Sequence, residues 1–258
     1  MMGNVNKKPA AVPPDHASQA LQPLPDTARP SSNQPVMVNY DCSHLTIGAG
    51  VAIFHIATSR VVLCRHSVDN YWFLPKGRRD AGEDTSAGAE REGFEESGYR
   101  NRLLPIPMRH RQPQPCNTLS NASSPFATEP IWTQLIPLTS NSQYMLFWYI
   151  AETLPPEMEK ELNAKTGTEA TATSPTPYQY PPKYPATLTL EERLEMEVGG
   201  HEPVHHLNTA VDSEEALYES HLLPVEEAVQ KLKGTIQEDV VRSGWQAIVR
   251  RHQTESKA

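Results

Sequence analysis

One short stretch of the chain, residues 73–100, limits its possible folds more than any other feature. It reads "FLPKGRRDAGEDTSAGAEREGFEESGYR" and holds seven carboxylates in 28 residues. Neighbouring carboxylates repel one another, so a folded chain tolerates this density in two situations. Either the acids cover a solvated helix face, or a cation that is not part of the chain compensates their charge. The spacing of the acids bears on this choice.

The middle of this stretch is predicted to form a helix of about three turns. Thr85 or Ser86 can act as its N-cap, and Gly98 suits the position after its last turn. At 100° per residue, Glu92, Glu95 and Glu96 fall within about 100° of one another on one face. Such a group of carboxylate oxygens suits hard cations, Mg²⁺ or Mn²⁺, and suits zinc poorly. On spacing alone, the solvated helix face remains an equal alternative.

Glu90 belongs to the same predicted helix but points away from the three glutamates. We therefore expect Glu90 to be an ordinary surface acid.

Further residues around the glutamates follow the order G-x5-E-x7-R-E-U-x-E-E-x-G-U, where U is a bulky apolar residue. They are Gly77, Glu83, Arg91, Glu92, Glu95, Glu96 and Gly98. This order resembles the Nudix box, the signature of the Nudix hydrolases, and the match runs from Gly77 to Tyr99. The resemblance implies a loop–helix–loop that holds divalent cations against a diphosphate, in a mixed α/β fold in which helices sandwich a mixed sheet.

The resemblance also implies roles for individual residues. The catalytic and metal-binding set would be Glu92, Glu95 and Glu96, with Mg²⁺ or Mn²⁺ as cofactor and the main-chain carbonyl of Gly77 as a further ligand. Glu83 and Arg91 would pair and hold the loop against the helix. For the general base, a late acidic segment offers Glu214 or Glu215; it is similar to a segment of dinucleoside tetraphosphate hydrolases in which an acid precedes a tyrosine, here Tyr218.

Gly93 departs from the box, because a bulky apolar residue is expected at its position. A glycine there removes a packing side chain and adds backbone entropy. Together with Gly88, the cost relative to alanine is about 2 kcal/mol. The sequence thus predicts a less stable helix.

The sequence "LPKG" at the start of the box resembles that of dinucleoside polyphosphate and diphosphoinositol polyphosphate hydrolases, which makes these the leading substrate classes. Lys76, Arg78 and Arg79 are candidates for binding phosphate, although a role as solvated surface residues fits each of them equally. An ADP-ribose or nucleotide-sugar pyrophosphatase is the main alternative. A Nudix-like binding or regulatory module without turnover is another.

The rest of the chain predicts one domain with irregular additions. Residues 1–39 are rich in proline and lack apolar periodicity, so we expect a disordered tail. Residues 40–252 would form the Nudix domain, interrupted by a low-complexity, mostly unstructured insertion at 153–186. Residues 253–258 would be a C-terminal tail. Apolar runs at 45–66 and 131–152 predict strands, and the spacing at 225–249 predicts helices.

Composition excludes several partners. A net charge of −8 and a pI near 5.7 disfavour DNA or an anionic membrane surface, which attract basic proteins. No apolar run approaches the roughly 18 residues of a membrane span. Three widely spaced cysteines indicate a reducing compartment, the cytoplasm or the nucleus. The expected partner is a small phosphoanhydride, and the oligomeric state stays open.

Overall fold

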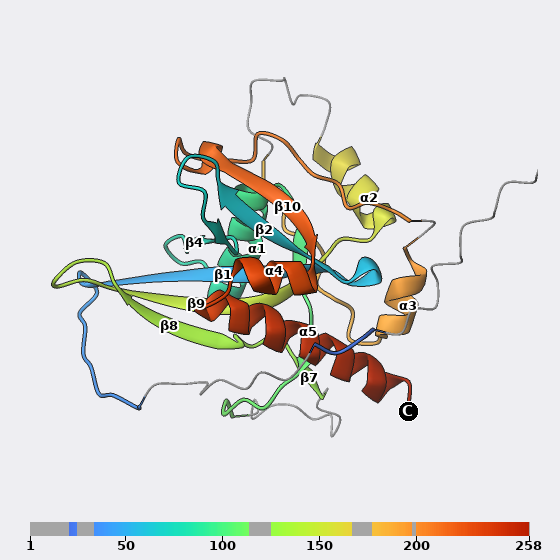
Figure 1. Cartoon of the computed structure of the whole chain (residues 1–258), viewed down its shortest axis with the longest axis horizontal. Coiled ribbons are helices and arrows are strands. Elements are labelled where there is room, and N and C mark those ends of the chain that lie inside the picture. The colour runs from blue at the N-terminus through green and yellow to red at the C-terminus, as the bar shows by residue number, and fades with distance from the viewer. Residues whose placement is uncertain (1–20, 25–33, 114–124, 167–176, 198–199, 258) are drawn as a thin grey trace, which may run out of the picture.

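The computed structural model describes residues 21–24, 34–113, 125–166, 177–197 and 200–257 (Figure 1). The strands are β1 (Leu45–His55), β2 (Arg60–His66), β3 (Trp72–Phe73), β4 (Lys76–Arg78), β5 (Asn101–Leu103), β6 (Ile106–Pro107), β7 (Phe126–Ala127), β8 (Trp132–Pro137), β9 (Gln143–Thr153) and β10 (Tyr218–Pro224). The helices are α1 (Thr85–Ser97), α2 (Pro156–Thr166), α3 (Leu190–Glu195), α4 (Val225–Lys231) and α5 (Ile236–Glu255). Short 3-10 turns lie at Ile56–Thr58 and Glu215–Leu217.

The centre of the fold is a mixed sheet with the strand order β10-β2-β1-β9-β5. β1 runs parallel to β9 and antiparallel to β2. Of the remaining strands, β4 pairs with the first half of β1, β3 with β2, and β8 with β9, whereas β6 and β7 form a separate small sheet. The strands predicted from the apolar runs at 45–66 and 131–152 are thus confirmed.

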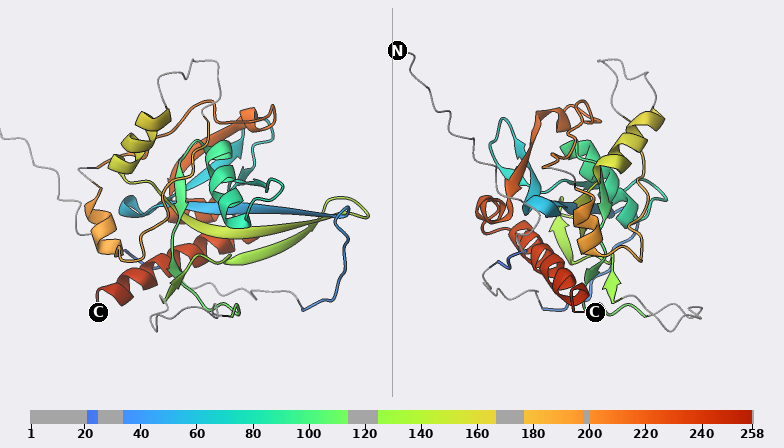
Figure 2. Two further views of the ribbon diagram at one scale, coloured as in Figure 1. Left: turned by 180° about the vertical axis from the view of Figure 1, so that it is seen from behind. Right: turned by 90° about the vertical axis from the view of Figure 1, so that its right-hand side faces the viewer.

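Helices cover both faces of this sheet, as the two views of Figure 2 show. Side chains alternate along β1, so that Val51 and Ile53 share one buried cluster with Ala89 of α1. Phe54 points to the opposite face and stacks on Trp245 of α5, with 5.8 Å between ring centroids. The predicted α/β/α sandwich with a mixed sheet is therefore confirmed. None of the helices in the described ranges is both long and apolar enough to cross a membrane.

The acidic helix lies close to its predicted position. α1 begins after Asp84, one residue before the expected cap, and ends at Gly98, whose φ of 70° is left-handed and whose N–H bonds to the Phe94 carbonyl. Glu90 differs from the prediction. It is half-buried and accepts a hydrogen bond from the Leu103 N–H at 2.7 Å, so it ties α1 to β5 instead of covering the surface.

Gly93 has a packing role that its place in the box did not indicate. A Cβ at this position would lie 2.6 Å from Asn101 Nδ2 and 2.8 Å from Val51 Cγ1. A glycine therefore lets α1 approach β1 and β5 closely. Phe94, fully buried, packs on the Arg100 guanidinium and the His206 ring. The predicted loss of packing at Gly93 was wrong, because a larger side chain there has no space.

We expect Gly93→Ala to lower the free energy of unfolding by about 1–3 kcal/mol, even though alanine favours helices, because overpacking a rigid interface displaces side chains or backbone. Urea denaturation monitored by circular dichroism measures the change. Ser86→Ala, a small change on the same helix, is the control and should alter stability by less than about 0.5 kcal/mol. A Gly93→Ala protein as stable as the wild type would contradict this account.

Parts of the predicted tails and insertion are ordered in the structure. Within the predicted N-terminal tail, Leu21 and Leu24 are buried against the core, and the Gln22 carbonyl accepts the indole N–H of Trp245 at 2.9 Å. Within the predicted insertion, α2 is a helix, so the expectation of a mostly unstructured segment was wrong for residues 156–166. Residues 1–20, 25–33 and 167–176 lie outside the described ranges, and the domain boundaries stay a prediction.

Candidate active site

The carboxylate-rich helix faces a cleft of about 750 Å³. Its lining comes from the start of β1, from β4 and the loop after it, from one face of α1, from the ends of β8 and β9 that lie next to each other, and from β10 with the turn before it. The lining residues are Thr46, Lys76, Gly77, Arg78, Arg79, Asp80, Ala81, Arg91, Glu92, Glu95, Glu96, Leu138, Tyr144, Val211, Asp212, Glu214, Glu215 and Tyr218. The cleft thus brings the predicted residues between Lys76 and Glu96 together with Glu214, Glu215 and Tyr218, which follow more than 100 positions later in the chain.

Three carboxylates form the centre of the cleft. Oxygens of Glu92, Glu96 and Glu215 all lie within 4.8 Å of one another. Glu92 and Glu96 are one helical turn apart on α1, and Glu215 comes from the 3-10 turn that precedes β10. Of the two predicted candidates in that turn, the structure places Glu215 with the helix acids. Glu214 also lines the cleft but is not in this group.

Glu95, the third predicted metal ligand, is engaged differently. Its carboxylate accepts a hydrogen bond from Arg91 Nη1 at 2.6 Å and is not one of the three oxygens that converge. Glu95 still lines the cleft, one turn from Glu92. Its role as a ligand stays a prediction.

Arg91 connects the acids of the loop and the helix. Its guanidinium donates to both Glu83 oxygens at 3.0 and 2.9 Å, to Glu92 at 2.9 Å, and to the main-chain carbonyl of Arg78 at 3.0 Å. The predicted Glu83–Arg91 pair is therefore present. Burial alone would raise the pKa of Glu83, but the hydrogen bonds from Arg91 and from the Asp80 N–H lower it overall, so Glu83 is a stable anion.

The pKa values of Glu92 and Glu96 are shifted in the opposite direction from that of Glu83. Burial, which removes solvation, raises the pKa of Glu96 to about 8, although Lys76 opposes the shift; Glu92 and Glu215 add to it. Burial also raises the pKa of Glu92 to about 7 in spite of Arg91. At neutral pH, Glu96 is therefore mostly protonated, because the positive charge nearby does not compensate the burial of its anion. A divalent cation would supply the missing positive charge.

The donor set fits such an ion. Three converging carboxylates supply only oxygen ligands, which is the chemistry that Mg²⁺ and Mn²⁺ prefer, and the described residues place no cysteine or histidine in the group. The Glu215 carboxylate is held in place by the main chain, because one of its oxygens accepts the Val211 N–H at 2.7 Å. Asp212 accepts the N–H groups of Glu214 and Glu215 at 2.8 and 2.9 Å and so holds the turn.

The three basic residues predicted to bind phosphate differ in their contacts. Lys76, Arg78 and Arg79 all line it. Arg79 donates to the main-chain carbonyls of Glu83 at 2.8 Å and Asp80 at 3.3 Å, which gives it a role in shaping the loop. The side chains of Lys76 and Arg78 have no ion pair among the described residues. Phosphate binding stays a prediction for all three.

The Gly77 carbonyl, predicted as a metal ligand, accepts a hydrogen bond from the Tyr144 hydroxyl at 2.8 Å. A carbonyl oxygen has two lone pairs, so this bond does not exclude a second partner. Tyr144 itself was not among the residues that the sequence indicated. Its position within an apolar strand is typical of a core aromatic, and its partner lies 67 positions away.

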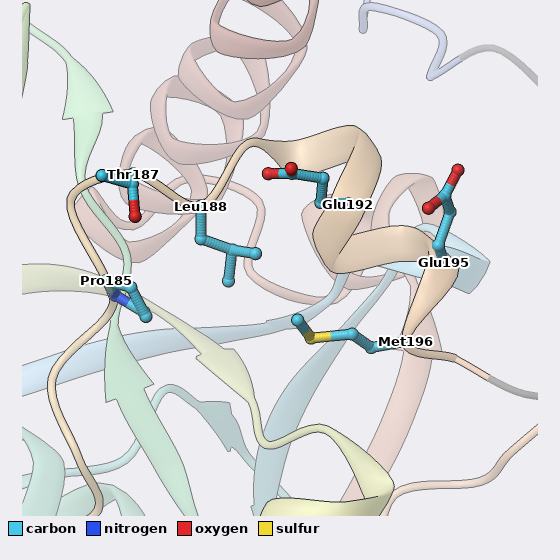
Figure 3. Close-up of a pocket in the computed structure, with 6 residues that line it drawn as sticks. All are labelled: Pro185, Thr187, Leu188, Glu192, Glu195 and Met196. Atoms are coloured by element: carbon cyan, nitrogen blue, oxygen red, sulfur yellow. The ribbon is translucent and has the colours of Figure 1, made fainter.

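A second hollow, of about 490 Å³, shares no residue with the cleft. Figure 3 shows it beside α3, lined by Pro185, Thr187, Leu188, Glu192, Glu195 and Met196. The Glu192 carboxylate already accepts hydrogen bonds from the Thr189 N–H and hydroxyl in a capping box. One of the two acids that line this hollow therefore serves the helix terminus.

Comparisons with known proteins agree with the box. Residues 45–157 match the family model described as the NUDIX domain. The protein named nucleoside diphosphate-linked moiety X motif 6 of Mus musculus is 36% identical over 72 residues, which cover 26% of this chain. The chain spans only 23% of the length of that relative.

Two similar solved structures are a hydrolase of the NUDIX family from Clostridium perfringens and the Ap4A hydrolase of C. elegans. The first is 15% identical with a TM-score of 0.39, and the match covers 79% of this chain and 95% of the other. The second is 13% identical with a TM-score of 0.35, and the match covers 83% and 99%.

Proposed function

We propose that the chain, whose residues 45–157 match the NUDIX domain model, is a divalent-cation-dependent hydrolase of a phosphoanhydride bond in a small molecule. The observation that carries this proposal is the convergence of Glu92, Glu96 and Glu215 within 4.8 Å. Glu92, Glu95 and Glu96 would hold the cation, and Glu215 lies close enough to them to face a water bound to that cation. A cation bound there would screen the phosphate oxygens and lower the pKa of an attacking water.

The chain's own residues divide the remaining work. Arg91 neutralises part of the acidic charge and orients Glu92 and Glu95 from the Glu83 side. Glu215 is the better candidate for the general base: burial raises its pKa, and a carboxylate in the cleft can accept the proton of water. Glu214, on the same turn, is the alternative. Lys76 and Arg78 would contact phosphate from the β4 side.

The charge balance of the cleft bears on the substrate class. Seven acidic residues line it (Asp80, Glu92, Glu95, Glu96, Asp212, Glu214 and Glu215), against four basic residues (Lys76, Arg78, Arg79 and Arg91). With two divalent cations bound, the formal charge of this lining would be only +1. A diphosphoinositol polyphosphate carries many more negative charges than such a cleft can balance. A dinucleoside polyphosphate carries fewer.

Aromatic side chains beside the cleft favour the same class. Tyr218 lines the cleft and meets Phe73 edge-on at 4.8 Å between centroids. Tyr71 packs on Phe73 at 5.4 Å and is 47% exposed. Exposed aromatic rings next to a phosphate site can stack a planar base, and an inositol ring has no such planar face. We therefore place dinucleoside polyphosphates first, with ADP-ribose as the second nucleotide candidate.

We expect the purified protein to hydrolyse diadenosine tetraphosphate in Mg²⁺ and to lose this activity in excess EDTA, because the acidic cluster alone repels the substrate. Product chromatography on a panel of diadenosine tetraphosphate, ADP-ribose and diphosphoinositol pentakisphosphate measures the selectivity. Glu226→Gln, an exposed acid on α4, is a matched control and should leave turnover unchanged. Fastest turnover of the inositol compound would contradict the proposed substrate class. Ligand binding without turnover of any compound would instead identify a non-catalytic binding module.

A further inference from the structure

β4 contacts different parts of the site through its two edges. Its main-chain groups alternate in direction, as in any strand. On the edge facing α1, the Lys76 N–H donates to Glu96 Oε2 at 2.7 Å, and the Arg78 carbonyl accepts from Arg91 Nη2 at 3.0 Å. This three-residue strand therefore orients Glu96, one of the converging carboxylates, and Arg91, which binds a second one, Glu92.

The edge of β4 that faces β1 carries the Gly77 carbonyl. β4 pairs with β1, and with no second strand among the described residues, so side chains supply its other hydrogen bonds. One of them comes from outside the pair: the Tyr144 hydroxyl, on β9, donates to Gly77 O at 2.8 Å. Tyr144 has to pass over β1 to reach this oxygen, because β1 lies between β9 and β4 in the sheet.

The Tyr144 side chain can cross β1 only because residue 48 of β1 is a glycine. A Cβ at position 48 would overlap both the Tyr144 hydroxyl and the Gly77 carbonyl. Burial, with Glu92 and Glu96 nearby, raises the pKa of Tyr144, so the phenol keeps the proton that it donates. The hydroxyl is thus a built contact between two strands that are not neighbours.

We propose that Tyr144 is a positioning residue for the cation site: by holding Gly77 from the β1 side, its hydroxyl fixes β4 so that Lys76 N–H and the Arg78 carbonyl present Glu96 and Arg91 in the geometry that binds the ion. Tyr144 needs no contact with the cation or the substrate for this role. The inference rests on the proposed cation-dependent function but concerns the affinity of the site for the ion, which can be measured without turnover.

The test compares Tyr144→Phe with Tyr149→Phe in the full-length protein. Tyr149 lies on the same strand and its hydroxyl is hydrogen-bonded to Thr85 Oγ1 at 2.7 Å, away from β4, so it controls for the loss of one tyrosine hydroxyl bond. Mg²⁺ affinity by isothermal titration calorimetry, or Mn²⁺ affinity by electron paramagnetic resonance, is the main readout. Thermal unfolding in EDTA measures the purely structural effect.

We expect Tyr144→Phe to weaken cation binding by about three- to tenfold, the equivalent of one hydrogen bond, while Tyr149→Phe changes it by less than twofold. In the hydrolysis assay, the Mg²⁺ concentration for half-maximal rate should rise by the same factor, with kcat at saturating Mg²⁺ within about twofold of wild type. Gly48→Ala, which places a methyl group where the hydroxyl lies, should weaken cation binding at least as much.

Three results have distinct meanings. Equal cation affinity in Tyr144→Phe and wild type would overturn the inference while leaving the proposed function intact. Equal weakening in Tyr144→Phe and Tyr149→Phe would also overturn it, because the effect would then be general loosening of β9. A wild-type protein that takes up no divalent ion would contradict the proposed function itself, and this inference with it.

Discussion

Replacing Glu96 with glutamine should reduce cation-dependent hydrolysis by at least about a hundredfold and, in the same protein, raise its stability in the absence of metal. The first effect follows from removing one of three converging charged oxygens. Loss of an indirect partner of a metal ligand already costs about 10–100-fold, so loss of a direct ligand should cost more. The second effect follows from burial: the Glu96 anion is poorly solvated, and glutamine carries no charge.

Glutamine preserves the local geometry, because its amide oxygen can still accept the Lys76 N–H that Glu96 accepts at 2.7 Å. Initial rates at saturating Mg²⁺ and thermal midpoints in EDTA at pH 8.5 measure the two effects. Each kcal/mol gained corresponds to about 2–4 °C for a domain of this size. Glu226→Gln should change neither quantity. An active Glu96→Gln protein would exclude this residue from the cation site, and a less stable one would contradict the electrostatic account.

The metal-free protein should lose stability as the pH rises toward 8, and Mg²⁺ should largely abolish this loss. Glu92 and Glu96 have folded-state pKa values of about 7 and 8, above the ordinary 4.5. Between pH 4.5 and about 8, the folded chain therefore retains protons that the unfolded chain has released. Stability then falls with increasing pH, by at most about 1.4 kcal/mol per pH unit for each retained proton, and levels off above pH 8.

Mg²⁺ binds the deprotonated acids, so its stabilising effect should be largest at high pH, reaching about 2.7 kcal/mol at a hundredfold excess over its Kd. Urea unfolding at pH 7.0, 7.75 and 8.5, in EDTA and in Mg²⁺, measures both trends. This window lies above the titration of His205, whose lowered pKa has the opposite effect on stability at acidic pH. Glu96→Gln should show a shallower slope in EDTA. A metal-free protein that gains stability from pH 7.0 to 8.5 would contradict the prediction.

The acidic helix illustrates how far local sequence information extends. Helix propensity, a left-handed glycine at position 98 and the 3.6-residue period act within a few residues, so the sequence predicted α1 almost to its ends. The Glu83–Arg91 pair, eight residues apart, was predicted from the resemblance to the Nudix box, and the structure contains it. Alternating apolar runs likewise indicated β1, β2 and β9, and hence the mixed α/β class.

Contacts between residues that are distant in the chain depend on tertiary packing. From the sequence, Gly93 was expected to weaken the helix; in the structure, Asn101 and Val51 occupy the space that a side chain at this position would need. Glu215, and not Glu214, lies with Glu92 and Glu96, because Asp212 and Val211 fix the turn that carries it. By itself, then, the sequence determined the acidic helix and the spacing of the box residues, which depend on neighbours in the chain, and it predicted a hard cation as their partner. Only the tertiary structure decided which carboxylates converge and how strongly burial raises their pKa values. It also decided that Tyr144 reaches β4 across Gly48. The reason is that desolvation and contact depend on elements that folding brings together.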